Sequence, residues 1–106
     1  MSTIKNVLNG KEKSCRPIWF MRQAGRHLPE FRKIRSKNNN FIKLCLDSDV
    51  SSEITLQPIQ RYDLDAAIIF SDILLVPYAL GQEVNFVKNE GPNLTKFNLK
   101  NFLNNS

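Results

Sequence analysis

The stretch AAIIF, at positions 66–70, is a continuous apolar run in which apolar and polar side chains do not alternate. Strands that are buried on both faces have this pattern, which is typical of parallel sheets. A second run, PIWFM at positions 17–21, opens with a proline and also predicts a short buried strand. The chain between the two runs has helical spacing, so strand, helix and strand together predict a βαβ unit. The expected fold class is therefore α/β.

The remaining segments predict several helices and one further strand. A long helix should begin with Ser48 or Asp49 as its N-cap, and Pro58 should kink or end it. Residues 83–87 are a weaker strand candidate, and residues 73–80 predict a short helical or loop passage. The other expected helices lie over residues 3–8, 30–37 and 41–46 and from residue 97 onward, and the expected loops lie over residues 23–29 and 38–40.

Length and composition place the chain among ordered proteins with at most one small domain. Of its 106 residues 42% are apolar, and Leu, Ile, Val and Phe alone account for 33. In disordered chains these four residue types stay below roughly 20%. The most apolar window, residues 64–80, carries two aspartates and a proline, which excludes a membrane-spanning helix. Lys5 and Asn6 stand where the apolar region of a signal peptide would begin, so we expect a cytoplasmic location.

Basic residues are concentrated in one part of the chain. The formal net charge is +5, and nine Lys and Arg residues lie between Lys11 and Lys37, where only Glu12 and Glu30 oppose them. Such a block suits an anionic partner, either nucleic acid or a small polyacid. A solvated basic face explains the charge equally well, so charge alone does not decide.

Residues that could bind a metal ion are sparse. Cys15 and Cys45 are the two cysteines, they stand far apart in the sequence, and His27 is the one histidine. A zinc site needs about four such ligands at characteristic spacing. We therefore expect no metal and interpret the cysteines as free thiols in a reducing compartment.

Charged residues follow directly after both predicted strands. Arg22 and Arg26, with Gly25 between them, come after the first strand, and Asp72 comes after the second. In parallel α/β folds, functional sites lie at the carboxyl ends of strands. Two guanidinium groups in a loop with a glycine predict a clamp for carboxylate or phosphate groups, and Asp72 would stabilise a cation. Two structural explanations stay open, an ion pair between Arg22 and Asp72 and an N-cap role of Asp72 for the segment from Ile73 onward.

Residues 17–26, PIWFMRQAGR, resemble the signature P-x-W-x-M-R-Q-A-G-R of the uroporphyrinogen decarboxylase family. The continuation HLPEFR at positions 27–32 and the block LDAAIIFSDIL at positions 64–74 are similar to the family as well. One departure is His27, where the family usually has tyrosine, and we expect a packing or surface role for it. Residues 53–58, 79–81 and 91–92 add further similarity.

The resemblance implies that residues 1–106 are the N-terminal portion of a (β/α)8 TIM barrel that is incomplete in this chain. It implies a homodimeric enzyme without metal or cofactor, with no nucleic-acid or membrane partner. Such an enzyme decarboxylates the four acetate side chains of uroporphyrinogen III to give coproporphyrinogen III in porphyrin and haem biosynthesis. A substrate with this many carboxylates would also explain the basic excess.

The resemblance further implies a role for each residue of the arginine loop. Arg22 and Arg26 would bind substrate carboxylates, and the backbone of residues 23–25 would line the site. Asp72 would receive the pyrrole N–H groups and stabilise the cationic ring that accepts electrons when carbon dioxide leaves. The expected substrate-binding residues are Arg22, Gln23, Ala24, Gly25, Arg26 and Asp72, and the expected catalytic residues among them are Asp72 and Arg22.

The length also limits what the chain is expected to do by itself. A TIM barrel takes about 250 residues, and the chain holds no counterpart of the family's remaining active-site tyrosine, serine or threonine, and late histidine. We therefore expect the 106-residue chain alone to be inactive and to have open sheet edges that are prone to aggregation. A truncated reading frame, an incomplete gene model and an expression fragment all fit this length.

Three other interpretations stay open. A nucleic-acid-binding module would use the basic block together with Trp19, Phe20 and Phe31, although Trp19 and Phe20 fall in the pattern of a buried strand. A methyltransferase of related fold would share the barrel and add metal and corrinoid partners, but the RQAGR loop and the FSD strand end point to the decarboxylase. The third interpretation is a fragment that has no function.

Overall fold

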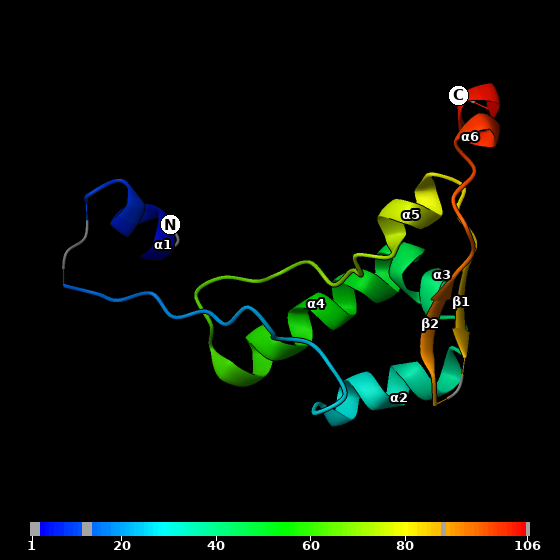
Figure 1. The fold of residues 1–106 in the computed structure, drawn as a ribbon. Coiled ribbons are helices and arrows are strands. Elements are labelled where there is room, and N and C mark those ends of the chain that lie inside the picture. The colour runs from blue at the N-terminus through cyan, green and yellow to red at the C-terminus, as the bar shows by residue number, and fades with distance from the viewer. Residues whose placement is uncertain (1–2, 12–13, 88, 106) are drawn as a thin grey trace. The chain divides into compact units, whose positions relative to one another are not determined.

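The computed structural model describes residues 3–11, 14–87 and 89–105 (Figure 1). The chain divides between Phe70 and Ser71 into two compact units. Among the described residues, the first unit contains helices and irregular chain, and the second contains helices and a two-stranded sheet. No helix in these ranges has both the length and the apolar character needed to cross a membrane.

Helix α4 (Ser48–Tyr62) is the longest helix of the first unit. Its N-cap is Asp47, whose Oδ1 atom accepts hydrogen bonds from the backbone N–H groups of Asp49, at 3.1 Å, and of the residue after it, at 3.0 Å. The prediction of Ser48 or Asp49 as the N-cap was therefore wrong, because an aspartate directly before the helix already satisfies two of its free N–H groups. The helix ends at Asp63, which has the left-handed backbone conformation with a φ of 51°.

Pro58 lies inside α4, and the helix continues to Tyr62. Of the two alternatives that the sequence left open, a kink or an end at Pro58, the end is excluded. A proline inside a helix removes one backbone hydrogen bond and crowds the preceding turn. The ring of Pro58 is fully buried, so the apolar surface that it removes from water offsets this cost.

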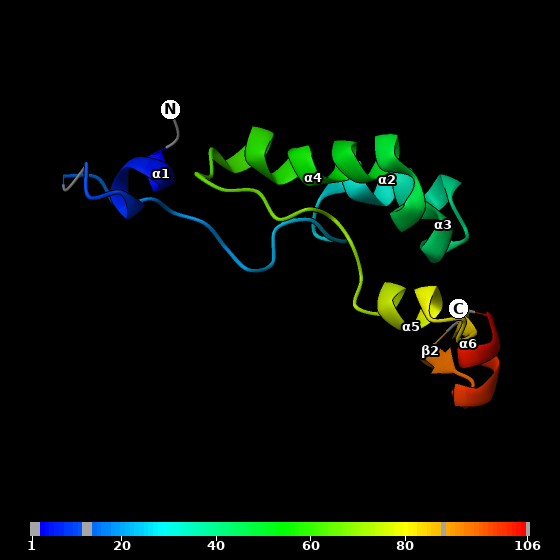
Figure 2. The same ribbon diagram turned by 90° about the horizontal axis from the view of Figure 1, so that it is seen from above.

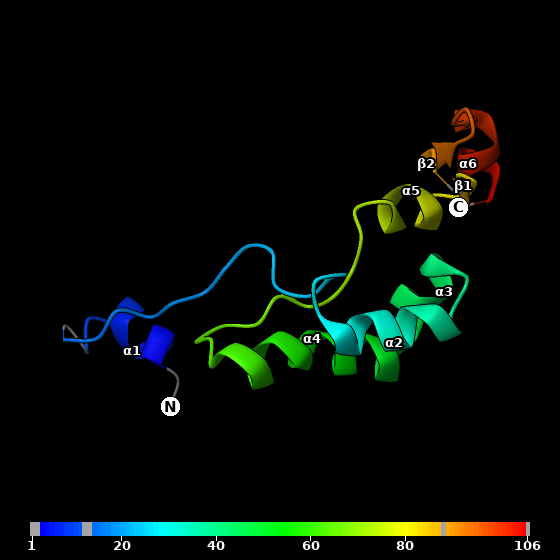
Figure 3. The same ribbon diagram turned by 90° about the horizontal axis from the view of Figure 1, so that it is seen from below.

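Helices α2 (Pro29–Lys37) and α3 (Phe41–Leu46) both pack against α4, as Figures 2 and 3 show. The prediction for 41–46 is confirmed, and so is that of α1 (Thr3–Leu8). The helix expected over 30–37 begins one residue earlier, at Pro29. The first helical turn accepts a proline because its backbone N–H groups have no partner within the helix.

The core of the first unit lies among α2, α3 and α4. The ring of Phe70, at the end of the second apolar run, packs edge-on against the ring of Phe31 with 5.6 Å between centroids. It packs in the same way against Phe41, with 6.0 Å between centroids. The run at 66–70 is therefore tied to the helices through its last residue. The buried cluster itself consists of Leu28, Phe31, Leu44 and Ile54.

Residues 17–21 and 66–70 run as irregular chain, so the two predicted strands were wrong as regular elements. Among the described residues, a backbone hydrogen bond joins the first run to the residue just before the second, from Asp65 N–H to the carbonyl of Ile18 at 2.9 Å. The N–H of Ile18 donates instead to the carboxylate Oδ2 of Asp65, at 2.8 Å. A strand ladder needs repeated backbone pairs, so the predicted βαβ unit keeps its order of segments but lacks a regular sheet in the described residues.

The apolar side chains of these two runs are largely exposed. Trp19 is 49% exposed, Phe20 59% and Ile69 78%. Burial on both faces, which the sequence predicted, is therefore not observed, because no described element of this unit covers them. Exposed apolar area of this kind favours association with a further partner surface.

The second unit begins with α5 (Leu75–Ala79) and continues into β1 (Val84–Val87) and β2 (Gly91–Leu94). The strands pair antiparallel in the register that places Val84 opposite Leu94. The helical passage expected within 73–80 and the strand expected over 83–87 are both confirmed. β2 was not predicted, because the proline and asparagine at its centre are poor strand formers.

Helix α6 (Leu99–Asn105) ends the described chain. We expected it from residue 97, and it begins two positions later. The side chain of Asn98 accepts a hydrogen bond from the backbone N–H of Asn101 at 3.2 Å. This is the bond that an N-cap residue makes, and it explains why the helix starts after Asn98.

We expect the substitution Ile54→Ala to destabilise the first unit by about 2–5 kcal/mol, because it leaves a cavity at a fully buried position. Leu56→Ala, in the same helix but 49% exposed, is the matched control and should cost far less. Urea unfolding followed by circular dichroism measures both variants. Equal losses would show that Ile54 does not lie in a packed core.

Candidate functional site

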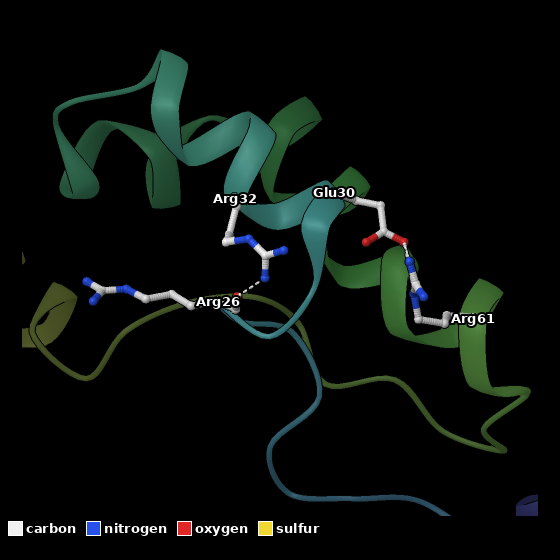
Figure 4. A network of polar contacts seen from close by, with 4 residues as sticks. All are labelled: Arg26, Glu30, Arg32 and Arg61. Atoms are coloured by element: carbon white, nitrogen blue, oxygen red, sulfur yellow. Dashed lines mark hydrogen bonds and ion pairs between the residues drawn. The ribbon is translucent and has the colours of Figure 1, made fainter.

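Residues 22–28 form a loop that enters α2, and this loop carries the two predicted arginines. Arg22 and Arg26 are both exposed, and Figure 4 shows the side chain of Arg26 extended away from α2. The loop closes on itself through a hydrogen bond from Leu28 N–H to the carbonyl of Gly25, at 3.0 Å. The structure therefore confirms the loop and leaves both arginines exposed, and the carboxylate clamp that they would form stays a prediction.

Gln23 lies between these arginines in sequence but is buried, with 5% of its surface exposed. Its Nε2 donates to the carbonyl of Ala66 at 2.9 Å, and its Oε1 accepts from the N–H of Ile68 at 3.1 Å. The amide thus supplies a donor and an acceptor to one edge of the second apolar run, as a neighbouring strand would. The side chain of Gln23 joins the loop to the run at 66–70 and does not face solvent.

Arg32 fastens the other end of the loop. Its Nη1 donates to the backbone carbonyl of Arg26 at 2.6 Å, as Figure 4 shows. Arg32 lies in the first turn of α2. The backbone N–H of Arg32 donates to the carbonyl of Leu28 at 3.1 Å. The backbone of Arg26 is therefore held by the helix while its side chain remains free to contact a ligand.

Gly25 lies at the centre of the loop, and the loop's own packing does not require a glycine there. A Cβ atom at this position would meet the ring of His27 at 3.5 Å, which is an ordinary van der Waals contact. The remaining reason for a glycine at this position is that it would let a ligand approach the backbone closely. His27 itself is exposed, which agrees with the packing or surface role predicted for it.

An ion pair joins the start of α2 to the end of α4, close to the arginine loop. Arg61 donates from Nη2 and Nε to Oε1 of Glu30, at 2.6 Å and 3.0 Å. A hydrogen bond from the backbone of Glu30 itself and then the bond from Arg61 lower the pKa of Glu30 below its ordinary value. The same bond raises the pKa of Arg61. Both side chains are partly exposed, so the pair orients the two helices more than it stabilises them.

Asp72 belongs to the second unit, where it precedes α5. Its Oδ1 accepts a hydrogen bond from the backbone N–H of Leu74 at 2.8 Å, and its carbonyl accepts from the N–H of Leu75 at 3.1 Å. The bond holds the turn before α5, whereas the N-cap of α5 itself is Leu74, which makes no side-chain cap bond. Oδ2 of Asp72 takes part in no hydrogen bond with the described residues, and it remains available to a ligand.

The structure brings some of the predicted site residues together and leaves one separate. Arg22, Gln23, Ala24, Gly25 and Arg26 share one loop of the first unit, in which Ala24 packs against the core. Asp72 lies in the second unit, so its proximity to the arginines and the alternative ion pair with Arg22 both stay predictions.

Cys15 is exposed and Cys45 is buried. Within the described ranges, no three His, Cys, Asp or Glu side chains gather in a way that would hold a metal ion.

Two features of the site were missed by the sequence. We assigned only the backbone of Gln23 to the site, whereas its side chain joins the loop to residues 66–68. We assigned nothing to Arg32. A buried glutamine and a surface arginine carry no sequence signal that separates them from ordinary residues, because both roles depend on partners elsewhere in the fold.

Comparison with known proteins places these residues in one family. The uroporphyrinogen decarboxylase (URO-D) family matches residues 1–102. The chain is 54% identical over 96 residues to the uroporphyrinogen decarboxylase of Rickettsia felis, which covers 89% of this chain and 28% of the relative. Identity is 56% over 97 residues with the protein of Rickettsia africae (92% and 28%), and 54% over 99 residues with that of Maricaulis maris (93% and 29%). The chain thus spans less than a third of the length of these relatives.

We expect Arg61→Gln to raise the pKa of Glu30 toward its ordinary value without restoring it fully, because the larger cause is the backbone bond of Glu30 itself. The lowered pKa means that Glu30 favours folding above its unfolded pKa and that this contribution is lost as the pH falls through the folded pKa. Carboxyl NMR titration measures the shift. Arg32→Gln is the control, since Arg32 is the weakest cause, and an equal shift in both variants would contradict this order.

Asp72→Ala should weaken the first turn before α5 by about 0.5–2 kcal/mol, because Leu74 N–H loses its acceptor. Asp72→Asn should retain most of this stability, since an amide oxygen also accepts the bond. Hydrogen exchange at the Leu74 amide measures the effect. Similar exchange in the wild type and in the alanine variant would show that the bond from Leu74 N–H to Asp72 does not stabilise this turn.

Proposed function

The chain belongs to the uroporphyrinogen decarboxylase family, and we propose from this membership that it forms the N-terminal part of an enzyme that decarboxylates uroporphyrinogen to coproporphyrinogen. The observation that carries the proposal is the loop at 22–28, in which two exposed arginines flank the buried side chain of Gln23. Two guanidinium groups in one loop match a substrate that carries many carboxylates.

The chemistry that such a substrate needs fits the residues of the chain. Loss of carbon dioxide from an acetate side chain leaves an electron pair, and protonation of the adjacent pyrrole carbon creates a cationic ring that accepts it. In this proposal Asp72 stabilises that cation, with the oxygen that the Leu74 bond leaves available. Arg22 and Arg26 hold the substrate carboxylates. A guanidinium is a poor acid because its pKa lies above ~12, so Arg22 would assist proton transfer chiefly by orienting the substrate.

The finer fold that we propose is the first portion of a (β/α)8 barrel. It is supported by the family membership and by the order of the first unit, in which helices lie between two neighbouring irregular runs. The contacts pair Ile18 with Asp65 and then Gln23 with Ala66 and Ile68, so that the runs point in the same direction. Parallel neighbours joined through helices are the repeating unit of such a barrel.

The homodimer and the absence of a metal or cofactor, which the resemblance implies, remain predictions for the whole protein. The cytoplasmic location, which was inferred from the N-terminal residues, remains a prediction as well.

A nucleic-acid-binding function is the second candidate. Its support is the exposure of Trp19 (49%) and Phe20 (59%) next to the basic block, which corrects the expectation that these rings are buried. Exposed aromatic rings beside positive charge can stack on bases. Family membership favours the decarboxylase. Salt-dependent binding of mixed DNA or RNA, without binding of a porphyrin polyacid, would favour the second candidate.

In the complete enzyme, Asp72→Asn should lower turnover by about 10²–10³-fold while substrate binding changes far less, because the amide cannot stabilise the cationic ring. The substitution leaves an acceptor for Leu74 N–H, so loss of fold does not explain a slow variant. Steady-state kinetics and the affinity for uroporphyrin measure the two effects. Asp63→Asn, at the exposed end of α4, is the matched control, and unchanged turnover in Asp72→Asn would refute the assignment.

A further inference from the structure

We propose that the side chains of Gln23 and Arg32 are positioning elements that hold the loop at 22–28 so that Arg22 and Arg26 are presented together to a polycarboxylate ligand. This inference rests on the proposed function and adds two residues that act through the arginines. Neither side chain needs to contact the ligand itself.

The first step of the argument is the burial and full pairing of Gln23. Its side chain is 5% exposed, and both of its amide atoms are paired with the backbone of the second apolar run, at 2.9 and 3.1 Å. A buried amide with satisfied hydrogen bonds is costly to displace. Because Gln23 follows Arg22 directly, its hydrogen bonds also hold the backbone of Arg22 in place.

The second step is the fastening at the other end. Arg32 Nη1 bonds the carbonyl of Arg26 at 2.6 Å, and Leu28 N–H bonds the carbonyl of Gly25 at 3.0 Å. The loop is thus held at Gln23, the neighbour of Arg22, and at the backbone carbonyl of Arg26. Figure 4 shows Arg32 directed at this carbonyl while Arg26 extends elsewhere.

The third step concerns charge. Arg22, Arg26 and Arg32 are like charges within eleven residues of sequence, and like charges repel one another at short range. A loop held only by its own turn would spread these groups and would have to be ordered at the moment of binding. Ordering in advance removes part of that entropic cost from the binding free energy.

The test uses the complete enzyme and uroporphyrin, a stable porphyrin octacarboxylate, as the probe. Gln23→Met keeps the length of the side chain and removes both hydrogen bonds. We expect the dissociation constant to rise about three- to tenfold, which corresponds to the usual net value of one or two hydrogen bonds. In a double-mutant cycle, Gln23→Met should add little when Arg22→Gln is already present, because the buried amide of Gln23 acts on the affinity through the neighbouring Arg22.

Thr55→Val is the matched control for a purely structural effect. It removes the hydroxyl that accepts from the N–H of Phe70 at 2.8 Å, in the same run that Gln23 binds but away from the arginine loop. It should lower stability without changing the affinity for uroporphyrin. An equal loss of affinity in Thr55→Val and Gln23→Met would overturn the proposal, and so would additive effects of Gln23→Met and Arg22→Gln.

Arg32→Gln covers the case in which Gln23→Met fails to fold, since Arg32 is exposed and its replacement removes the bond to Arg26 and, beyond it, a weak electrostatic effect on Glu30. We expect a weaker version of the same coupling with Arg26→Gln, and full additivity would overturn the proposal. If Arg22→Gln and Arg26→Gln leave uroporphyrin binding unchanged, the proposed function of the loop fails first. If they weaken binding while the variants of Gln23 and Arg32 do not, only this inference fails.

Discussion

The backbone of Phe70 is held at both of its polar groups by hydroxyls of one helix, and the first unit depends on this attachment. Thr55 accepts from its N–H at 2.8 Å, and Ser51 donates to its carbonyl at 2.8 Å. Thr55 in turn donates to the carbonyl of Ser51 at 2.7 Å. Because a buried peptide group without partners is costly, these bonds allow the ring of Phe70 to enter the core between Phe31 and Phe41.

The same requirement explains how two apolar runs remain ordered without a regular sheet. Their backbone groups are satisfied by side chains, by Asp65 for Ile18 and by Gln23 for Ala66 and Ile68. Side-chain partners do not extend along a strand as a ladder does, so the apolar faces of the runs stay exposed. In a larger fold, neighbouring strands would complete the backbone pairs, and helices would cover these faces.

The candidate site is a consequence of this arrangement. One glutamine both completes the edge of the run at 66–70 and fixes the loop that carries Arg22 and Arg26. A site built on such an anchor gains its geometry from the backbone of residues 66–68, to which Gln23 bonds, rather than from the flexibility of the loop. In this arrangement the exposed charged side chains would contact the ligand, and the buried neutral side chain holds their loop in position.

The sequence by itself determined the family, the helices, the arginine loop and the strand at β1, because these features depend on local spacing and on a long motif of fixed residues. It placed the cap of α4 wrongly, and it left open an end of that helix at Pro58 that does not occur, since burial of the proline ring outweighs a local backbone rule. It predicted two buried strands from apolar runs, but a strand needs neighbours, and only the tertiary structure shows which backbone groups find partners. The roles of Gln23, Arg32 and Thr55 were likewise decided by tertiary structure alone, because each depends on a residue that the fold brings to it.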